Sequence, residues 1–118
     1  MRNFALGLAT LSAVFLIGAT AAEAHARLAN ASPAPGSTVA TSPGEVTLSF
    51  TENLEPKFSG AEVQNAAGTR VDQGSSASGN SMRVELKGLA AGAYSVHWHA
   101  LSVDMHKTKG TFNFRVGK

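Results

Sequence analysis

Alternating hydrophobic and polar residues recur through the second half of the chain and predict β-strands. Glu45–Phe50 alternates strictly, with Val46, Leu48 and Phe50 on one face and polar residues on the other. Side chains on successive strand residues point to opposite faces, so this pattern is typical of a half-buried strand. Further strands are predicted at Arg27–Asn30, Ala61–Gln64, Thr69–Val71, Met82–Lys87, Tyr94–Ser102 and Gly110–Val116.

The segments between these runs carry turn residues. Ser32–Ser37 contains two prolines and a glycine, Asn53–Pro56 interrupts the pattern, and Gln73–Ser81 is rich in Gly and Ser and is predicted to be a loop. No sustained helical period follows residue 24. About seven short strands joined by turns predict an all-β sandwich of immunoglobulin-like or cupredoxin-like type, with Trp98 as the main core aromatic.

The first 24 residues have the pattern of a secretory signal peptide. Arg2 precedes an uncharged stretch from Phe4 to Ala22, and Ala22-Glu23-Ala24 forms an A-x-A cleavage pattern. An uncleaved membrane anchor is the alternative, because the stretch nears spanning length, but Gly, Ser and Thr residues interrupt it. We expect residues 1–24 to be removed and residues 25–118 to form a periplasmic domain that is not embedded in the membrane.

Composition limits the function classes. Removal of the first 24 of the 118 residues leaves 94, enough for one domain with one core. The net charge of +2 is too small and too scattered to indicate nucleic-acid binding. The chain has no cysteine, so an exported domain must be stable without disulfides and cannot bind a metal through thiolates.

Cleavage after Ala24 creates a candidate metal ligand. His25 becomes the first residue and offers both its α-amine and its imidazole. Asp104 and His106, two positions apart, share one side of the chain if the segment is extended. Amine, two imidazoles and one carboxylate make a set of three nitrogens and one oxygen, which suits tetragonal Cu(II). The alternative reading is a chance N-terminal histidine and a polar loop.

Two other histidines compete for this role. His97 and His99 share the face of their strand that is opposite Val96 and Trp98, and they lack an evident third ligand nearby. We favour an outward polar face for them, although one of the two could hydrogen-bond to a metal ligand without binding the metal itself. After cleavage only Met82 and Met105 remain among the methionines, too few for a thioether site for Cu(I).

Several segments together resemble a known family. They are His25–Leu28, Ser32–Ser37, Leu48–Asn53, Phe58–Ala61, Gly92–Trp98 and Leu101–Phe112. In this order they are similar to the CopC family of periplasmic copper-binding proteins. The resemblance covers nearly all of residues 25–118, and the N-terminal His with a later D-x-H-x-x-x-G is its most specific part.

The resemblance implies a Greek-key β-barrel or sandwich and one Cu(II) held by His25, Asp104 and His106. It also implies copper carriage, sequestration or resistance in the periplasm, with an inner-membrane copper-uptake partner of the CopD type. Some family members have a methionine-rich Cu(I) loop, but Val63–Ser81 contains no Met or His, so we expect no Cu(I) site. Glu52 lies in a family-like segment and is left outside the predicted ligands.

The leading hypothesis is therefore a monomeric, non-catalytic copper-binding protein. One alternative is an oxidative copper enzyme, because an N-terminal His also binds copper in polysaccharide mono-oxygenases. Such an enzyme needs an open copper position and exposed aromatics, whereas the single Trp and Tyr lie on a predicted core face. A second alternative is a metal-free interaction module of immunoglobulin type.

Overall fold

A computed structural model describes residues 26–117 of the chain, and in this part nearly all regular structure is β-strand. The predicted signal peptide and His25 lie outside the described residues. The strands are β1 (Leu28–Ser32), β2 (Thr38–Val39), β3 (Glu45–Phe50), β4 (Gly60–Asn65), β5 (Asp72–Ser78), β6 (Ser81–Leu86), β7 (Gly92–Leu101) and β8 (Lys107–Val116), with one 3-10 turn, η2 (Pro56–Phe58). Within residues 26–117, no helix is long and apolar enough to span a membrane.

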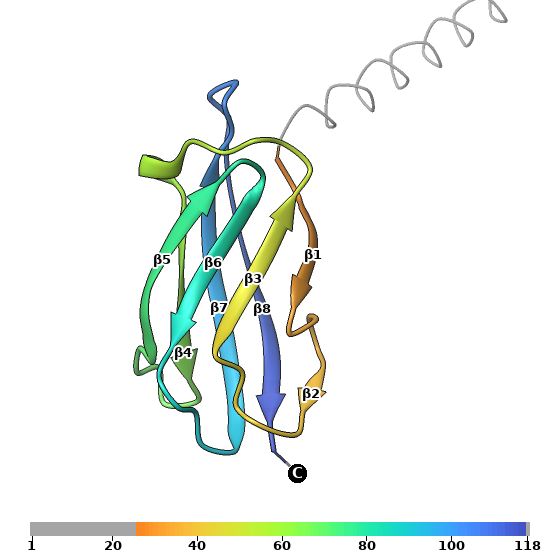
Figure 1. The fold of residues 1–118 in the computed structure, drawn as a ribbon, viewed down its shortest axis with the longest axis vertical. Helices are drawn as coiled ribbons and strands as arrows, with labels where there is room; N and C mark the ends of the chain where they lie inside the picture. Colours follow the sequence, from red (N-terminus) through yellow and green to blue (C-terminus); the bar gives the residue numbers. More distant parts are fainter. Residues whose placement is uncertain (1–25, 118) are drawn as a thin grey trace, which may run out of the picture.

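The strands form two four-stranded sheets that face each other (Figure 1). One has the order β1-β3-β6-β5 and the other β2-β8-β7-β4. The connections from β3 to β4 and from β6 to β7 cross between the sheets, a Greek-key arrangement. The predicted all-β sandwich is confirmed, although the sheets are open and not a closed barrel, and the described residues form eight strands where about seven are expected.

Most predicted strands lie where alternation places them. Buried and more exposed residues alternate along β3 and along β6, as the sequence indicates. Two predictions are wrong. Thr69–Val71 is not a strand, since only an isolated bridge joins Arg70 to Gln64, and the expected loop over Gln73–Ser81 contains most of β5.

The loop prediction fails because β5 is formed by pairing and not by burial. Asp72 is its one fully buried residue, and the others are exposed or half-buried, so no apolar alternation marks the strand. Its backbone pairs with β6 from Asp72↔Leu86 to Ser78↔Ser81. Tertiary pairing therefore overrides the turn-like Gly and Ser composition.

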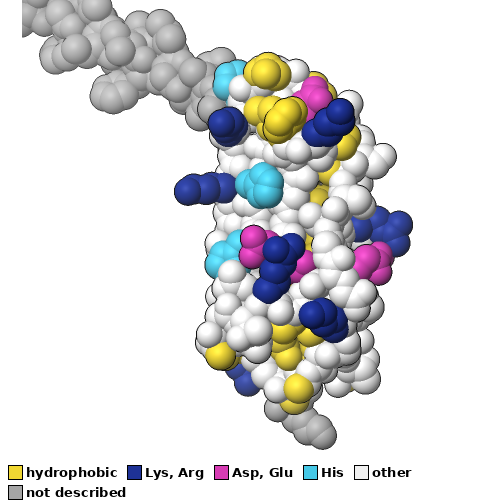
Figure 2. All heavy atoms as spheres, turned by 90° about the vertical axis from the view of Figure 1, so that its left-hand side faces the viewer, with side chains coloured by type: hydrophobic (Ala, Val, Ile, Leu, Met, Phe, Trp, Pro, Cys, Tyr) yellow, Lys and Arg dark blue, Asp and Glu magenta, His cyan; other side chains and the backbone are white. Residues whose placement is uncertain are grey.

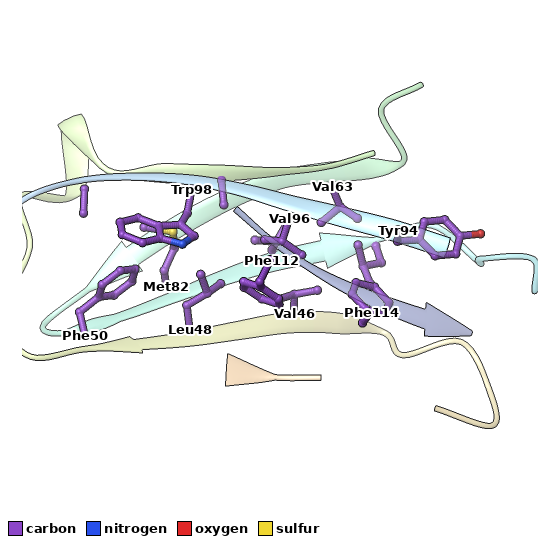
Figure 3. Close-up of a cluster of buried hydrophobic side chains, with 14 of the residues drawn as sticks. Val46, Leu48, Phe50, Val63, Met82, Tyr94, Val96, Trp98, Phe112 and Phe114 are labelled. Atoms are coloured by element: carbon purple, nitrogen blue, oxygen red, sulfur yellow. The ribbon is translucent and has the colours of Figure 1, made fainter. Parts of the chain in front are cut away.

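The core lies between the sheets and is aromatic at both ends (Figure 3). Trp98 packs edge-on against Phe50 at one end, with ring centroids 5.1 Å apart. Tyr94 stacks on Phe114 at the other, with centroids 5.6 Å apart. Trp98 is 9% exposed, which confirms it as a core aromatic.

Gly110 on β8 allows Trp98 to lie against the backbone. The two residues are paired across β7 and β8, and a Cβ at position 110 would come within 2.6 Å of Trp98 Cζ2. That distance is far below a normal carbon contact, so any side chain at 110 must displace the indole ring. A glycine is therefore required here by close approach.

We expect Gly110→Ala to lower the free energy of unfolding by about 1–3 kcal/mol, because the indole must move within a packed core. Urea unfolding followed by the fluorescence of the single Trp measures this. Gly88→Ala is the matched control, since nothing lies within 4 Å of a Cβ built there. Equal effects of both substitutions would contradict the packing account.

The two sheets are tied together along one side by hydrogen bonds from β4 to β5. The Ala61 amide donates to Ser75 Oγ at 3.1 Å, and the Val63 amide donates to Asp72 Oδ2 at 2.8 Å. These bonds satisfy donors on the edge strand of one sheet with side chains of the other. The edge of β4 is thereby protected from pairing with another chain.

Asp72 is the buried centre of this contact. Burial by itself raises the pKa of its carboxyl, but bonds donated by Arg70 and by the amides of Val63 and Gly74 outweigh burial and hold the pKa below its usual value. A depressed folded-state pKa contributes stability that is present above the unfolded pKa of about 3.9 and lost as pH falls through the folded pKa. Asp72 thus stabilises the sandwich most at neutral pH.

We expect Asp72→Asn to lower the free energy of unfolding at pH 7 by about 1–3 kcal/mol, because buried amides and Arg70 lose a charged acceptor. The variant should also lose less stability than the parent between pH 5 and pH 3. Urea unfolding across that range measures both effects. In the control Glu62→Gln, an exposed pair with Arg70 at 4.0 Å is removed, and the cost should stay below about 1 kcal/mol.

Candidate metal centre

The turn between β7 and β8 carries two of the three predicted ligands. The Ser102 amide donates to the His106 carbonyl at 3.0 Å, and the Met105 amide donates to the Ser102 carbonyl at 2.8 Å. A loop of three residues thus closes the hairpin, a type in which the last loop residue adopts a left-handed conformation. Met105 takes that conformation, with φ of 75°.

Left-handed backbone is costly for a residue with a side chain, by about 1–2 kcal/mol. Met105 is also 70% exposed, so its side chain gains little from packing. The ten residue pairs between β7 and β8 therefore hold the turn in place. The result is a tight turn that fixes the positions on either side of Met105.

Asp104 and His106 are in contact across this turn. His106 Nδ1 lies 3.2 Å from Asp104 Oδ1, and each side chain is 46% exposed. The segment is a turn and not the extended strand on which the sequence prediction depended, and it is this turn that brings the carboxylate and the imidazole together. Both groups are accessible from solvent, as a site that exchanges a metal ion requires.

Ser102 positions the carboxylate of Asp104 through a hydrogen bond. It is fully buried, and its hydroxyl donates to Asp104 Oδ1. This hydrogen bond is the main reason that the pKa of Asp104 lies below its usual value, slight desolvation raises it, and His106 lowers it further. Asp104 is consequently an ionised carboxylate at neutral pH. Sequence reasoning missed Ser102, although its place two residues before Asp104 is a visible signal.

The segment Thr51–Asn53 links the start of the fold to this turn. Thr51 bonds to Arg27 twice, its amide donating to the Arg27 carbonyl and its hydroxyl accepting from the Arg27 amide, both at 2.9 Å. Asn53 accepts from the Val103 amide at 3.0 Å. Consecutive Cα atoms are about 3.8 Å apart, so Thr51 and Asn53 are separated by no more than about 7.6 Å.

Ala26 anchors the chain beside this segment. It has no exposed surface and belongs to the hydrophobic core. Ala26 is the covalent neighbour of His25, so the point from which His25 leaves the fold is fixed. Figure 1 shows that β1 begins at the end of the sandwich where the β7–β8 turn lies.

Within residues 26–117, no group of three or more His, Cys, Asp or Glu side chains is arranged to hold a metal ion. Asp104 and His106 are therefore the two predicted ligands that lie in the described part of the chain. His25, the third predicted ligand, lies outside it. A complete site of the predicted kind needs the N-terminal residue.

His97 and His99 lie elsewhere, on the outer face of the β2-β8-β7-β4 sheet. The ring of His97 bonds to Ser95 Oγ at 3.0 Å and to Thr111 Oγ1 at 3.2 Å, so both of its nitrogens have hydroxyl partners. His99 is exposed and pairs with Lys109 across the hairpin. At about 3.3 Å per residue, His99 is roughly 10 Å along the strand from Ser102, and His97 is farther.

Comparison with known proteins gives the family of the chain. Residues 28–117 match the CopC domain family. The chain belongs to the CopC family. Copper resistance protein C of Xanthomonas campestris pv. juglandis is 34% identical over 110 residues, which cover 85% of this chain and 86% of that protein.

Two solved structures of the family are also similar. The crystal structure of CopC from Methylosinus trichosporium OB3b has a TM-score of 0.75 and 31% identity, covering 79% of this chain and 94% of that one. PcoC from Escherichia coli, described as a methionine-rich copper resistance protein, has a TM-score of 0.71 and 34% identity, covering 79% of this chain and 99% of that one. The predicted family is thereby confirmed.

We expect Ser102→Ala to raise the pKa of the Asp104 carboxyl, because its main hydrogen-bond donor is removed. Carboxyl carbon chemical shifts followed through a pH titration measure this. Ser95→Ala, which removes a hydroxyl bonded to His97, is the control and should leave Asp104 unchanged. An unaltered Asp104 titration in Ser102→Ala would show that Ser102 does not tune the carboxylate.

Proposed function

We propose that this protein binds one Cu(II) in the periplasm through the His25 amine and imidazole, Asp104 and His106, for copper carriage, sequestration or resistance. The observation that carries the proposal is the contact between Asp104 and His106 in a turn bonded to Thr51–Asn53, which also holds Arg27. The start of the fold and the turn with Asp104 and His106 are therefore hydrogen-bonded to the same short segment of backbone.

The donor set fits Cu(II) chemically. Three nitrogens and one oxygen suit the tetragonal geometry of Cu(II). The lowered pKa of Asp104 provides an ionised carboxylate without displacement of a proton at neutral pH. An unperturbed α-amine titrates near 8, so Cu(II) has to displace one proton from it at neutral pH.

Export and cleavage belong to the same proposal. Residues 1–24 act as the signal peptide, and their removal makes His25 the first residue of the domain. The buried Ala26 supports this boundary, since the residue next to the proposed N-terminus is packed in the core. The name of the Xanthomonas relative, copper resistance protein C, agrees with a role in copper handling.

The distribution of methionines supports Cu(II) over Cu(I). Met82 is fully buried between the sheets and Met105 is exposed on the β7–β8 turn, so the two thioethers are not grouped. PcoC is described as methionine-rich, whereas this chain has three methionines in all. We therefore propose a single Cu(II) site without the Cu(I) loop of other family members.

A binding role is favoured over catalysis. Trp98 and Tyr94 are both buried, which leaves Phe58 as the only exposed Phe, Trp or Tyr side chain among residues 26–117. A single ring does not make the exposed aromatic surface that polysaccharide mono-oxygenases use. A metal-free interaction module would leave the contact between Asp104 and His106 without a role. We propose that the protein works as a monomer and exchanges copper with an inner-membrane partner of the CopD type.

We expect copper titration of residues 25–118 to show one tetragonal Cu(II) centre with nitrogen couplings by electron paramagnetic resonance. His106→Ala should weaken Cu(II) binding strongly, since a coordinating imidazole is lost. His97→Ala is the matched control and should change Cu(II) affinity by no more than about tenfold. This is the smallest loss typical for a residue that only hydrogen-bonds to a metal ligand. Loss of binding in His97→Ala with retention in His106→Ala would contradict the site.

A further inference from the structure

The end of the molecule with the proposed copper ligands is also its most exposed apolar region. Among residues 26–117 the exposed large hydrophobic side chains are Phe58, Val103 and Met105, at 63%, 51% and 70%. We name these three residues the apolar tip. Figure 2 shows hydrophobic side chains gathered at this end, beside a histidine.

Backbone hydrogen bonds hold the apolar tip together. Val103 bonds to Asn53 at 3.0 Å, and the Glu55 amide donates to the Leu101 carbonyl at 2.8 Å. The Phe58 amide in turn donates to Glu55 at 3.1 Å. The segment that leads into η2 thus runs beside the start of the β7–β8 turn, and Phe58 shares one end of the sandwich with Val103 and Met105.

The charges around the apolar tip favour an anionic surface. The exposed cations at this end are Arg27, Lys57, Lys107 and Lys109. The acids there are Glu52 and Glu55, both half-buried, and Asp104, which is exposed but paired with His106. Figure 2 shows Lys or Arg side chains on both sides of the apolar group, with an acidic side chain beside it. Four exposed cations thus face three acids, of which two are half-buried, and this end carries a small positive excess.

The shape of this end decides between a lipid surface and a protein. The β7–β8 turn forms a narrow projection beyond the sheets (Figure 1). A stable protein interface buries about 800 Å² on each partner, which three side chains on a turn and a single helical turn do not provide. Amphipathic helices that lie in a membrane interface combine such apolar side chains with Lys and Arg, and the same chemistry favours a lipid surface here.

We propose that the apolar tip docks onto an anionic lipid bilayer, with Phe58, Val103 and Met105 among the headgroups and the lysines against their phosphates. This inference rests on the proposed function for its role, because docking would hold the copper site at the membrane surface. Bound Cu(II) adds positive charge beside Asp104. The copper-loaded protein therefore binds such a surface more tightly than the metal-free protein.

Co-sedimentation with vesicles tests the proposal. Residues 25–118 contain every described strand and are mixed with vesicles of phosphatidylcholine alone or with about 30% phosphatidylglycerol, a fraction that gives a negative surface potential. We expect binding to the anionic vesicles, little binding to the neutral ones, and weakening by salt. Loading with Cu(II) should increase the bound fraction.

Variants locate the contact. Phe58→Ser and Val103→Ser should each weaken vesicle binding by about tenfold, through loss of buried apolar surface. Lys107→Glu should weaken it, whereas Lys87→Glu, an equal charge change at an exposed site at the other end of the sandwich, should not. Thermal unfolding by circular dichroism confirms that each variant is folded.

The outcomes separate this inference from the proposed function. Vesicle binding that is lost in Phe58→Ser while Cu(II) binding persists supports docking through the apolar tip. Vesicle binding by a protein that takes up no Cu(II) supports docking and overturns the copper proposal. Absence of binding to anionic vesicles, or equal effects of Lys87→Glu and Lys107→Glu, overturns docking and leaves a protein as the occupant of the tip.

Discussion

The hydrogen bonds of Thr51–Asn53 are the constraint on which the proposed site depends. This segment leaves β3 in one sheet and leads toward β4 in the other. At its first residue it bonds to Arg27, and at its last to Val103. The start of the fold and the β7–β8 turn are therefore both hydrogen-bonded to this one segment of three residues, where the chain crosses between the sheets.

Packing on both sides keeps this connection rigid. Ala26 and Phe50 are buried in the core next to the segment, and the T-shaped contact of Phe50 with Trp98 links it to β7. Gly110 then lets β8 approach the Trp98 ring closely. Because β7 and β8 pair over ten residues, the core also fixes where Asp104 and His106 are presented. The exposed pair of Asp104 and His106 thus depends for its position on the buried contact between Phe50 and Trp98.

The sequence predicts what depends on local pattern. Alternation locates β3 and β6. The sequence places Asp104 and His106 on one side of the chain only if the segment is extended, whereas a turn with left-handed Met105 brings them into contact. The sequence also does not predict β5, whose Gly and Ser residues form a strand through pairing with β6. The bond between Arg27 and Thr51 also escapes prediction, because it joins residues 24 apart and leaves no periodic signal. Long-range backbone pairing is the information that local pattern lacks.

The most direct test of the proposed site concerns the α-amine of His25. A variant with one glycine before His25 keeps the imidazole but converts the amine into an amide, which is a poor ligand unless the metal removes its proton. We expect this variant to keep the circular dichroism of the β-sandwich and to bind Cu(II) much more weakly, with an altered electron paramagnetic resonance spectrum. Unchanged affinity and an unchanged spectrum would contradict a site built on the N-terminal amine.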